Sequence, residues 1–148
     1  MEGGTMKKEV KGESRPLQDI LNGQFSIDYY QRAYVWGEEQ VEELITDIST
    51  EFLNNWKEGH KTEDTFHYDP YYLGEIILVD DNKTPSKKII DGQQRITTLT
   101  LLFIYILRTY GEKHPELITE LQSLIYKNNR GKSRFNLEID GRMKCMDL

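Results

Sequence analysis

The feature that most constrains the fold is residues 93–110, the most hydrophobic stretch of the chain. Its apolar residues lie mainly on one side at helical spacing, and three others cover much of the rest; together they are Ile96, Leu99, Leu102, Phe103, Ile106, Leu107 and Tyr110, with Leu101, Ile104 and Tyr105. A helix that is apolar nearly all round has to be covered on most sides. We therefore expect a central, buried helix ending at Gly111, with the other elements packed around it.

The bulk properties describe one acidic globular domain. The 148 residues include 37% hydrophobic and 30% charged side chains, enough for a single core of moderate size. A net charge of −6 argues against a protein that coats nucleic acid with its whole surface, although a local basic patch stays compatible. The single cysteine, Cys145, has no disulfide partner in the chain, is expected to be inert and favours a cytoplasmic location. No apolar run approaches the ~20 residues that span a membrane, so no membrane partner is expected.

The remaining elements follow from local signals. Residues 1–14 are polar and without period, which predicts a disordered lead before one domain over 15–148. The domain stops soon after its last predicted strand, which suggests a truncated C-terminus. The predicted elements are a helix from Pro16 to Leu21, a strand at 25–27, an amphipathic helix at 38–57 with a Gly37–Gln40 capping box, a loop at 58–69, paired strands at 71–79 and 88–91, an inward-facing helix from Pro115 through Leu117, Ile118, Leu121, Leu124 and Ile125, and a strand in which Phe135, Leu137 and Ile139 alternate.

The segment from Asp91 to Arg95 joins a strand to the long helix. As plain structure, Asp91 can cap the helix and Gln94, three residues on, can complete a capping box. Gly92 and Arg95 fit this interpretation poorly, because glycine in a first turn costs up to ~1 kcal/mol and a cation there opposes the helix dipole. Free amides of a first turn, a glycine that admits a ligand and a guanidinium fork are typical of a phosphate site.

Two threonines follow one turn later. The hydroxyls of Thr97 and Thr98 can add contacts to a phosphate, or they can bond back to helix carbonyls. We favour the second interpretation.

The segment Tyr29-Tyr30-Gln31-Arg32-Ala33-Tyr34-Val35-Trp36 concentrates aromatic side chains around one arginine. Such a segment can stack a base and hold a phosphate. It can equally supply core aromatics and a surface ion pair. The segment alone leaves both interpretations open.

Together, YQRAYVW, YYLGEIILV and IIDGQQRITTLTLL, in this order, resemble the N-terminal domain of GmrSD-type restriction endonucleases over residues 17–110. The resemblance implies an α+β, ParB/sulfiredoxin-like fold with a small mixed sheet packed against several helices. It also implies a nucleotide-binding regulatory domain in modification-dependent DNA restriction or phage defence, with NTP hydrolysis as a further expectation.

The resemblance assigns Gln31, Arg32 and residues 91–95 to the site, and local chemistry adds Thr97 and Thr98. Expected cofactors are an NTP and Mg²⁺, with no dedicated protein metal site. We expect catalysis from Asp91, Gln94 and Arg95, and nucleotide or phosphate binding from Gln31, Arg32, Gly92, Gln93, Arg95, Thr97 and Thr98. Asp28 stands where the family commonly has proline, which adds a negative charge near the proposed phosphate site.

No nuclease centre is expected in this chain, because His60, His67 and His114 match no metal-binding spacing. The resemblance places cutting in a downstream His-Asn-His nuclease domain, in the full-length protein or a partner chain, with DNA as substrate; the oligomeric state stays open. Glu75, inside a predicted apolar strand, needs a partner, and a salt bridge is favoured over a magnesium ligand shared with Asp91.

Two other functions stay open. A DNA-binding, modified-base-sensing module without NTPase activity would use Arg32, Arg95 and the basic stretch Lys83, Lys87 and Lys88. A pure interaction domain would use the motif only as a helix cap.

Overall fold

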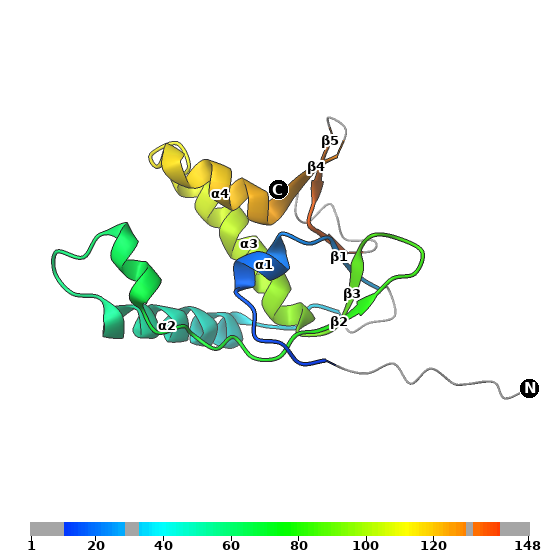
Figure 1. Ribbon diagram of the computed structural model, residues 1–148, viewed down its shortest axis with the longest axis horizontal. Coiled ribbons are helices and arrows are strands. Elements are labelled where there is room, and N and C mark those ends of the chain that lie inside the picture. The colour runs from blue at the N-terminus through cyan, green and yellow to red at the C-terminus, as the bar shows by residue number, and fades with distance from the viewer. Residues whose placement is uncertain (1–10, 29–32, 130–131, 140–148) are drawn as a thin grey trace, which may run out of the picture.

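The computed structural model describes residues 11–28, 33–129 and 132–139. In chain order its elements are α1 (Leu17–Leu21), β1 (Phe25–Ile27), α2 (Glu38–Asn55), the 3-10 helix η1 (Thr62–His67), β2 (Ile77–Asp80), β3 (Lys87–Asp91), α3 (Gln93–Tyr110), α4 (Pro115–Ile125), β4 (Tyr126–Asn129), β5 (Lys132–Phe135) and β6 (Leu137–Ile139) (Figure 1). The predicted α+β class is confirmed, and the ParB/sulfiredoxin-like subtype stays a prediction.

A four-stranded mixed sheet carries the fold, in the order β2-β3-β1-β6. The central strand β1 is parallel to both β3 and β6, and β2 is antiparallel to β3, which confirms the predicted pairing of these two strands. Because parallel strands end at the same edge, the carboxyl ends of β1 and β3 lie together. The chain leaves that edge at Asp28 and again at Asp91.

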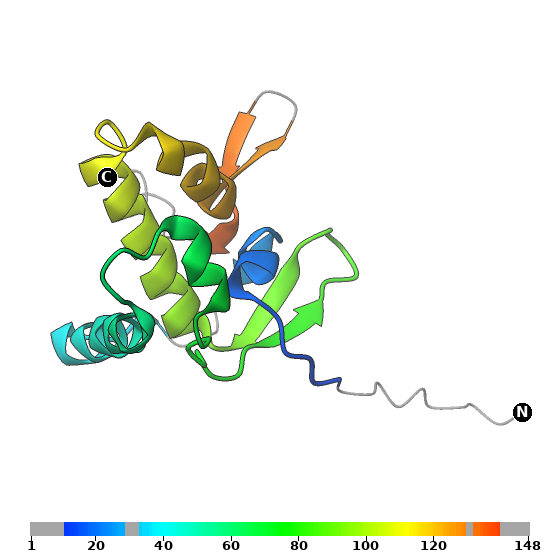
Figure 2. The same ribbon diagram turned by 60° about the vertical axis from the view of Figure 1, so that its left-hand side comes forward.

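The core forms where α3 and α4 cover the sheet (Figure 2). Its buried members are Leu21, Phe25, Ile27, Ile89, Ile96, Ile104, Ile125, Phe135 and Leu137. The bounds of α3 agree with the prediction, but burial all round holds only for its first half, from Ile96 to Thr100. Tyr105 is 59% exposed and Tyr110 44%, so the expected uniform burial is wrong for the second half. There α4 covers one side of the helix and leaves another open.

The helix α4 begins at Pro115 as predicted. Of the five residues expected to face inward, only Ile125 is buried, and Leu117 is exposed. The prediction of an inward face is therefore wrong for the start of α4, since only its C-terminal end reaches the core.

The predicted final strand is interrupted at Asn136. Alternation would turn Asn136 away from the core, yet this residue is only 3% exposed. Its side-chain Nδ2 donates to the backbone carbonyls of Leu21 and Ser123, both at 2.9 Å. Its backbone carbonyl accepts from the Phe25 N–H at 2.7 Å. Asn136 thus joins α1, α4 and β1, and the break separates β5 from β6. The hairpin of β4 and β5 was not predicted, because residues 126–129 are too polar to give a strand signal.

Residues 37–72, here called the arm, project from the side of the sheet and α3 (Figure 1). The predicted start of α2 is confirmed, because the Gly37 N–H donates to Oε1 of Gln40 at 2.8 Å. The 3-10 helix η1 replaces part of the predicted loop and is held on α2 by the Asp69 N–H, which donates to Oδ1 of Asn55 at 3.1 Å. Leu44 is the one buried residue of α2. Across residues 11–28, 33–129 and 132–139, no helix combines the length and apolarity needed to cross a membrane.

Candidate functional site

Gly92 begins α3 in a left-handed conformation, with φ of 86°. A Cβ at this position would lie 3.0 Å from Cγ1 of Ile76 and 3.2 Å from the carbonyl oxygen of Glu75. Positive φ and close backbone approach are the two conditions that favour glycine. Gly92 therefore has a structural reason that the sequence did not reveal, because segment 75–76 passes too close for a side chain.

The predicted cap formed by Asp91 and Gln94 is wrong. The N-cap is Gly92, and no side-chain cap bond is formed at this end of α3 among the described residues. Gly92 and not Asp91 precedes the first helical residue, and Oδ1 of Asp91 accepts from the Gly92 N–H at 2.8 Å. A glycine N-cap has no side chain of its own to cap the first turn, where the helix dipole favours an anion.

Gln94 connects α3 to the first motif. Its Oε1 accepts hydrogen bonds from the N–H groups of Val35 at 2.9 Å and Trp36 at 3.3 Å. Its Nε2 donates to the carbonyl of Ala33 at 3.1 Å. The side-chain amide of Gln94 thus bonds to the backbone of segment 33–36 through both its oxygen and its nitrogen. These bonds bring the two motifs of the sequence together. Gln94 is a positioning residue in this geometry, and its predicted catalytic role stays a prediction.

Arg95 connects α3 to the segment that leaves the arm. Its Nη1 donates to the carbonyl of Leu73 at 2.7 Å, and its guanidinium lies against Gly74, where φ is 96° and any Cβ would overlap it. Arg95 therefore also has a structural role that the sequence did not reveal. In the described part of the chain this is the only hydrogen bond of the guanidinium, which leaves its other donors for a ligand.

A tyrosine extends this connection into the arm. The Tyr71 hydroxyl donates to Oδ2 of Asp47 on α2 at 3.3 Å. Burial and the nearby carboxylates of Asp47 and Glu43 raise the pKa of Tyr71, while the Arg95 cation opposes the rise. The phenol therefore stays a neutral donor that ties segment 71–73 to α2.

The two threonines predicted as site residues lie inside the protein. Thr97 and Thr98 are 6% and 5% exposed. The Thr98 hydroxyl donates to the Gln94 carbonyl at 2.9 Å, which confirms back-bonding at this residue. Its oxygen also lies 2.9 Å from the Tyr34 hydroxyl, which must donate because the threonine hydrogen is already used. Nucleotide binding by the two threonines stays a prediction.

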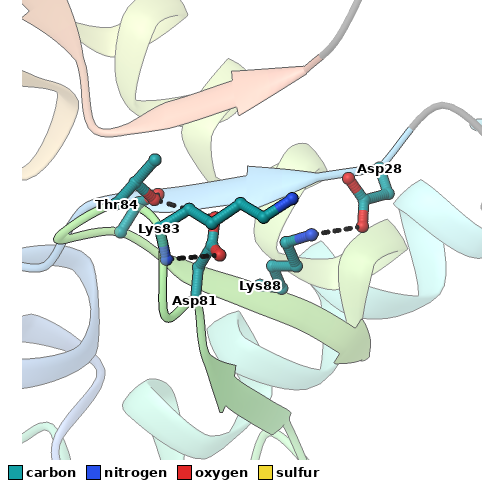
Figure 3. Close-up of polar contacts among 6 residues, drawn as sticks. Asp28, Asp81, Lys83, Thr84 and Lys88 are labelled. Atoms are coloured by element: carbon teal, nitrogen blue, oxygen red, sulfur yellow. Dashed lines mark hydrogen bonds and ion pairs between the residues drawn. The ribbon is translucent and has the colours of Figure 1, made fainter.

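Asp28 and Lys88 form an ion pair beside this edge of the sheet (Figure 3). Nζ of Lys88 lies 2.9 Å from Oδ2 of Asp28, and the two side chains are 32% and 22% exposed. The negative charge of Asp28 is thus offset by a cation from β3. Of the predicted basic stretch, Lys87 also has a carboxylate neighbour, Asp80, at 3.7 Å.

The turn between β2 and β3 is shaped by Asp81. Its carboxylate accepts from the Lys83 N–H at 3.0 Å and the Thr84 hydroxyl at 2.9 Å (Figure 3). These bonds favour the ionised form and lower the pKa of Asp81.

The other predicted site residues divide into three groups. Gln31 and Arg32 lie outside the described residues, as does Cys145. Gln93 is half-buried at the start of α3. Glu75 is exposed and precedes β2, so its predicted place inside a buried strand is wrong.

The described residues contain no group of three or more His, Cys, Asp or Glu side chains placed to hold a metal ion. His60 instead bonds through Nδ1 to the Tyr68 hydroxyl at 2.7 Å.

Replacing Gln94 by alanine is expected to loosen the start of the arm. The change removes three hydrogen bonds, so we expect the free energy of unfolding to fall by about 1–3 kcal/mol and the Val35 and Trp36 amides to exchange faster with solvent. Hydrogen exchange and urea denaturation measure both effects. Gln122→Ala, on the exposed side of α4, is the matched control. Unchanged protection at Val35 and Trp36 would contradict the assigned role.

Comparison with known proteins adds the family. The search of curated proteins returned no match. Residues 16–144 match the family described as the GmrSD restriction endonuclease, N-terminal domain. The match includes every described helix and strand and both sequence motifs. The chain therefore belongs to the family of GmrSD restriction endonuclease N-terminal domains.

Proposed function

We propose that this domain binds the phosphates of a nucleotide at the first turn of α3, as the regulatory part of a DNA restriction or phage-defence protein. The observation that carries the proposal is an uncapped helix start, preceded by the left-handed Gly92, at the carboxyl edge of the parallel strands β1 and β3. Ligands of α/β sheets bind outside the carboxyl ends of strands, and helix N-termini attract phosphate.

The charges at this edge support the same ligand. Arg95 keeps guanidinium donors beyond the one given to Leu73, and Lys88 offsets the charge of Asp28. The carboxylate of Asp91 would repel a bare phosphate, so the proposed ligand is an Mg²⁺–NTP complex, whose cation Asp91 would help to hold. Gln31 and Arg32 follow Asp28 closely in the sequence and complete the proposed site.

Hydrolysis is proposed as a second step, with Asp91 as the residue that orients water. Asp91 is exposed and lies at the uncapped turn, and Gln94 would act by holding segment 33–36 in place. Cutting of DNA is assigned to a separate His-Asn-His domain of the full-length protein or of a partner chain, in the cytoplasm.

Calorimetric titration with the four common NTPs, with and without Mg²⁺, tests the proposal. We expect binding in the micromolar range, and Arg95→Ala should weaken it by at least about tenfold because a charge-assisted phosphate contact is lost. Arg108→Ala removes the same charge from the exposed far end of α3 and should leave the affinity unchanged.

Thermal unfolding of each variant separates loss of binding from loss of folding, since Arg95 also bonds to Leu73. Arg95→Lys should give an intermediate affinity, because it keeps the charge and loses the planar fork. Absence of binding heat with every NTP would contradict nucleotide binding. Equal affinities of wild type and a folded Arg95→Ala protein would contradict this site.

A further inference from the structure

The net negative charge of the chain is concentrated in the arm. Residues 38–69 contain ten aspartates and glutamates against two lysines, a net charge of −8, whereas the whole chain has −6. The remainder is therefore weakly positive. The acidic side chains lie along α2 and continue into η1, where Glu63 and Asp64 occupy the first turn.

The same arm exposes large apolar side chains at its outer end. We call Phe52, Leu53, Trp56 and Phe66 the arm patch; their exposed fractions are 45%, 63%, 46% and 85%. Trp56 follows Phe52 and Leu53 by four and three residues, the spacing that places side chains next to one another on a helix. The ring of Phe52 also lies 5.5 Å from that of Tyr68 beside η1. The exposed side chains of α2 and η1 thus lie at the same end of the arm, and exposed apolar residues close together mark interaction surfaces.

The core of the domain does not account for this arrangement. An amphipathic helix of 18 residues normally gains its stability by packing one face against neighbours. Only Leu44 of α2 is buried. The C-terminal half of α2 contacts the segment beside the short η1 rather than the sheet. The apolar end of the arm is thus built without a covering element from the described residues.

We propose that the arm patch is a docking surface for a basic protein face with an apolar centre, of the kind that DNA-binding enzymes carry. A rim of carboxylates repels the phosphates of nucleic acid and attracts lysine and arginine. An aromatic anchor inside a charged rim is the usual composition of a protein interface. The cations of β3 in a second copy of this domain are poor complements, because Lys87 and Lys88 already face the carboxylates of Asp80 and Asp28. This inference does not depend on nucleotide binding.

A short amphipathic helical peptide of leucine and lysine, a minimal basic face with an apolar stripe, tests the surface. We expect calorimetric binding to the whole chain that weakens between about 50 and 300 mM salt, because part of the attraction is between exposed charges. The double variant Leu53→Ser with Trp56→Ser should lower the affinity by at least about tenfold. Tyr105→Ser, an equally exposed aromatic on α3, should not change it.

Two further peptides complete the design. A leucine–glutamate peptide should not bind, and a lysine peptide without leucine should bind more weakly than the amphipathic one. No binding of the leucine–lysine peptide, or equal binding by wild type and the arm-patch variant, would overturn the proposal. A dimer in light scattering that the arm-patch variant abolishes would overturn it in favour of a second copy.

Discussion

Gly92→Ala is expected to lower the free energy of unfolding by about 2–3 kcal/mol. Part of this loss, about 1 kcal/mol, is the cost of a left-handed conformation for a residue with a Cβ. The rest arises because the new methyl group would press on the Ile76 side chain and on the Glu75 carbonyl, at 3.0 and 3.2 Å. Urea denaturation measures the effect.

Gly59 provides the matched control. Its φ is 90°, close to that of Gly92, but a Cβ at Gly59 would meet no atom within 4 Å. Gly59→Ala should therefore show the conformational cost alone, about 1 kcal/mol. Equal losses in the two variants would mean that the approach of segment 75–76 to the helix start is looser than described. A larger loss at Gly92 should be accompanied by weaker nucleotide binding, since the same contact positions the proposed site.

Asn136→Ala is expected to cost about 3 kcal/mol. The substitution removes the donor of two hydrogen bonds, one to the buried carbonyl of Leu21 and one to the half-buried carbonyl of Ser123. A small cavity adds to the loss because the residue is almost fully buried. Asn54→Ala, at an exposed position of α2, should stay within about 0.5 kcal/mol of wild type.

Asn136→Asp distinguishes the hydrogen bonds from the packing. The aspartate has nearly the same shape, but an ionised carboxylate would face two carbonyl oxygens. Burial raises the pKa of such a carboxyl above its unfolded value, so the folded state holds its proton more tightly and stability falls as pH rises. We therefore expect this variant to be more stable near pH 4 than near pH 7, relative to wild type at each pH. A difference that does not change with pH would contradict the assigned contacts.

Local signals predicted the elements near the site well. The bounds of α3 were predicted because Gly111 follows a long apolar run, and β1 and the pairing of β2 with β3 followed from alternation and turn residues. The start of α2 followed from Gly37 and Gln40. These features depend on neighbours in the sequence, which a single sequence displays.

The contacts within the site were not predictable in the same way. The roles of Gln94 and Arg95 depend on segments 33–36 and 73–74, which reach α3 only through the tertiary fold. Sequence reasoning found no structural reason for Arg95, yet its guanidinium bonds to Leu73. Gln94 was expected to cap its own helix but holds segment 33–36 instead. The predictions for Asn136, which is buried, and for Tyr105, which is exposed, were wrong for the same reason. Periodicity indicates which residues share a face of an element, but it does not indicate what covers that face.

The pairing of β1 with β6 has a consequence for synthesis of the protein. Phe25 pairs with Leu137, so β1 cannot form this pairing until residue 137 has left the ribosome. Parallel strands so distant in sequence pair slowly, because the chain between them loses conformational entropy before the strands make any stabilising contact. Until then one edge of β1 has no partner, and the nascent chain presents an open strand edge next to the apolar α3, the state in which aggregation or chaperone capture competes with folding.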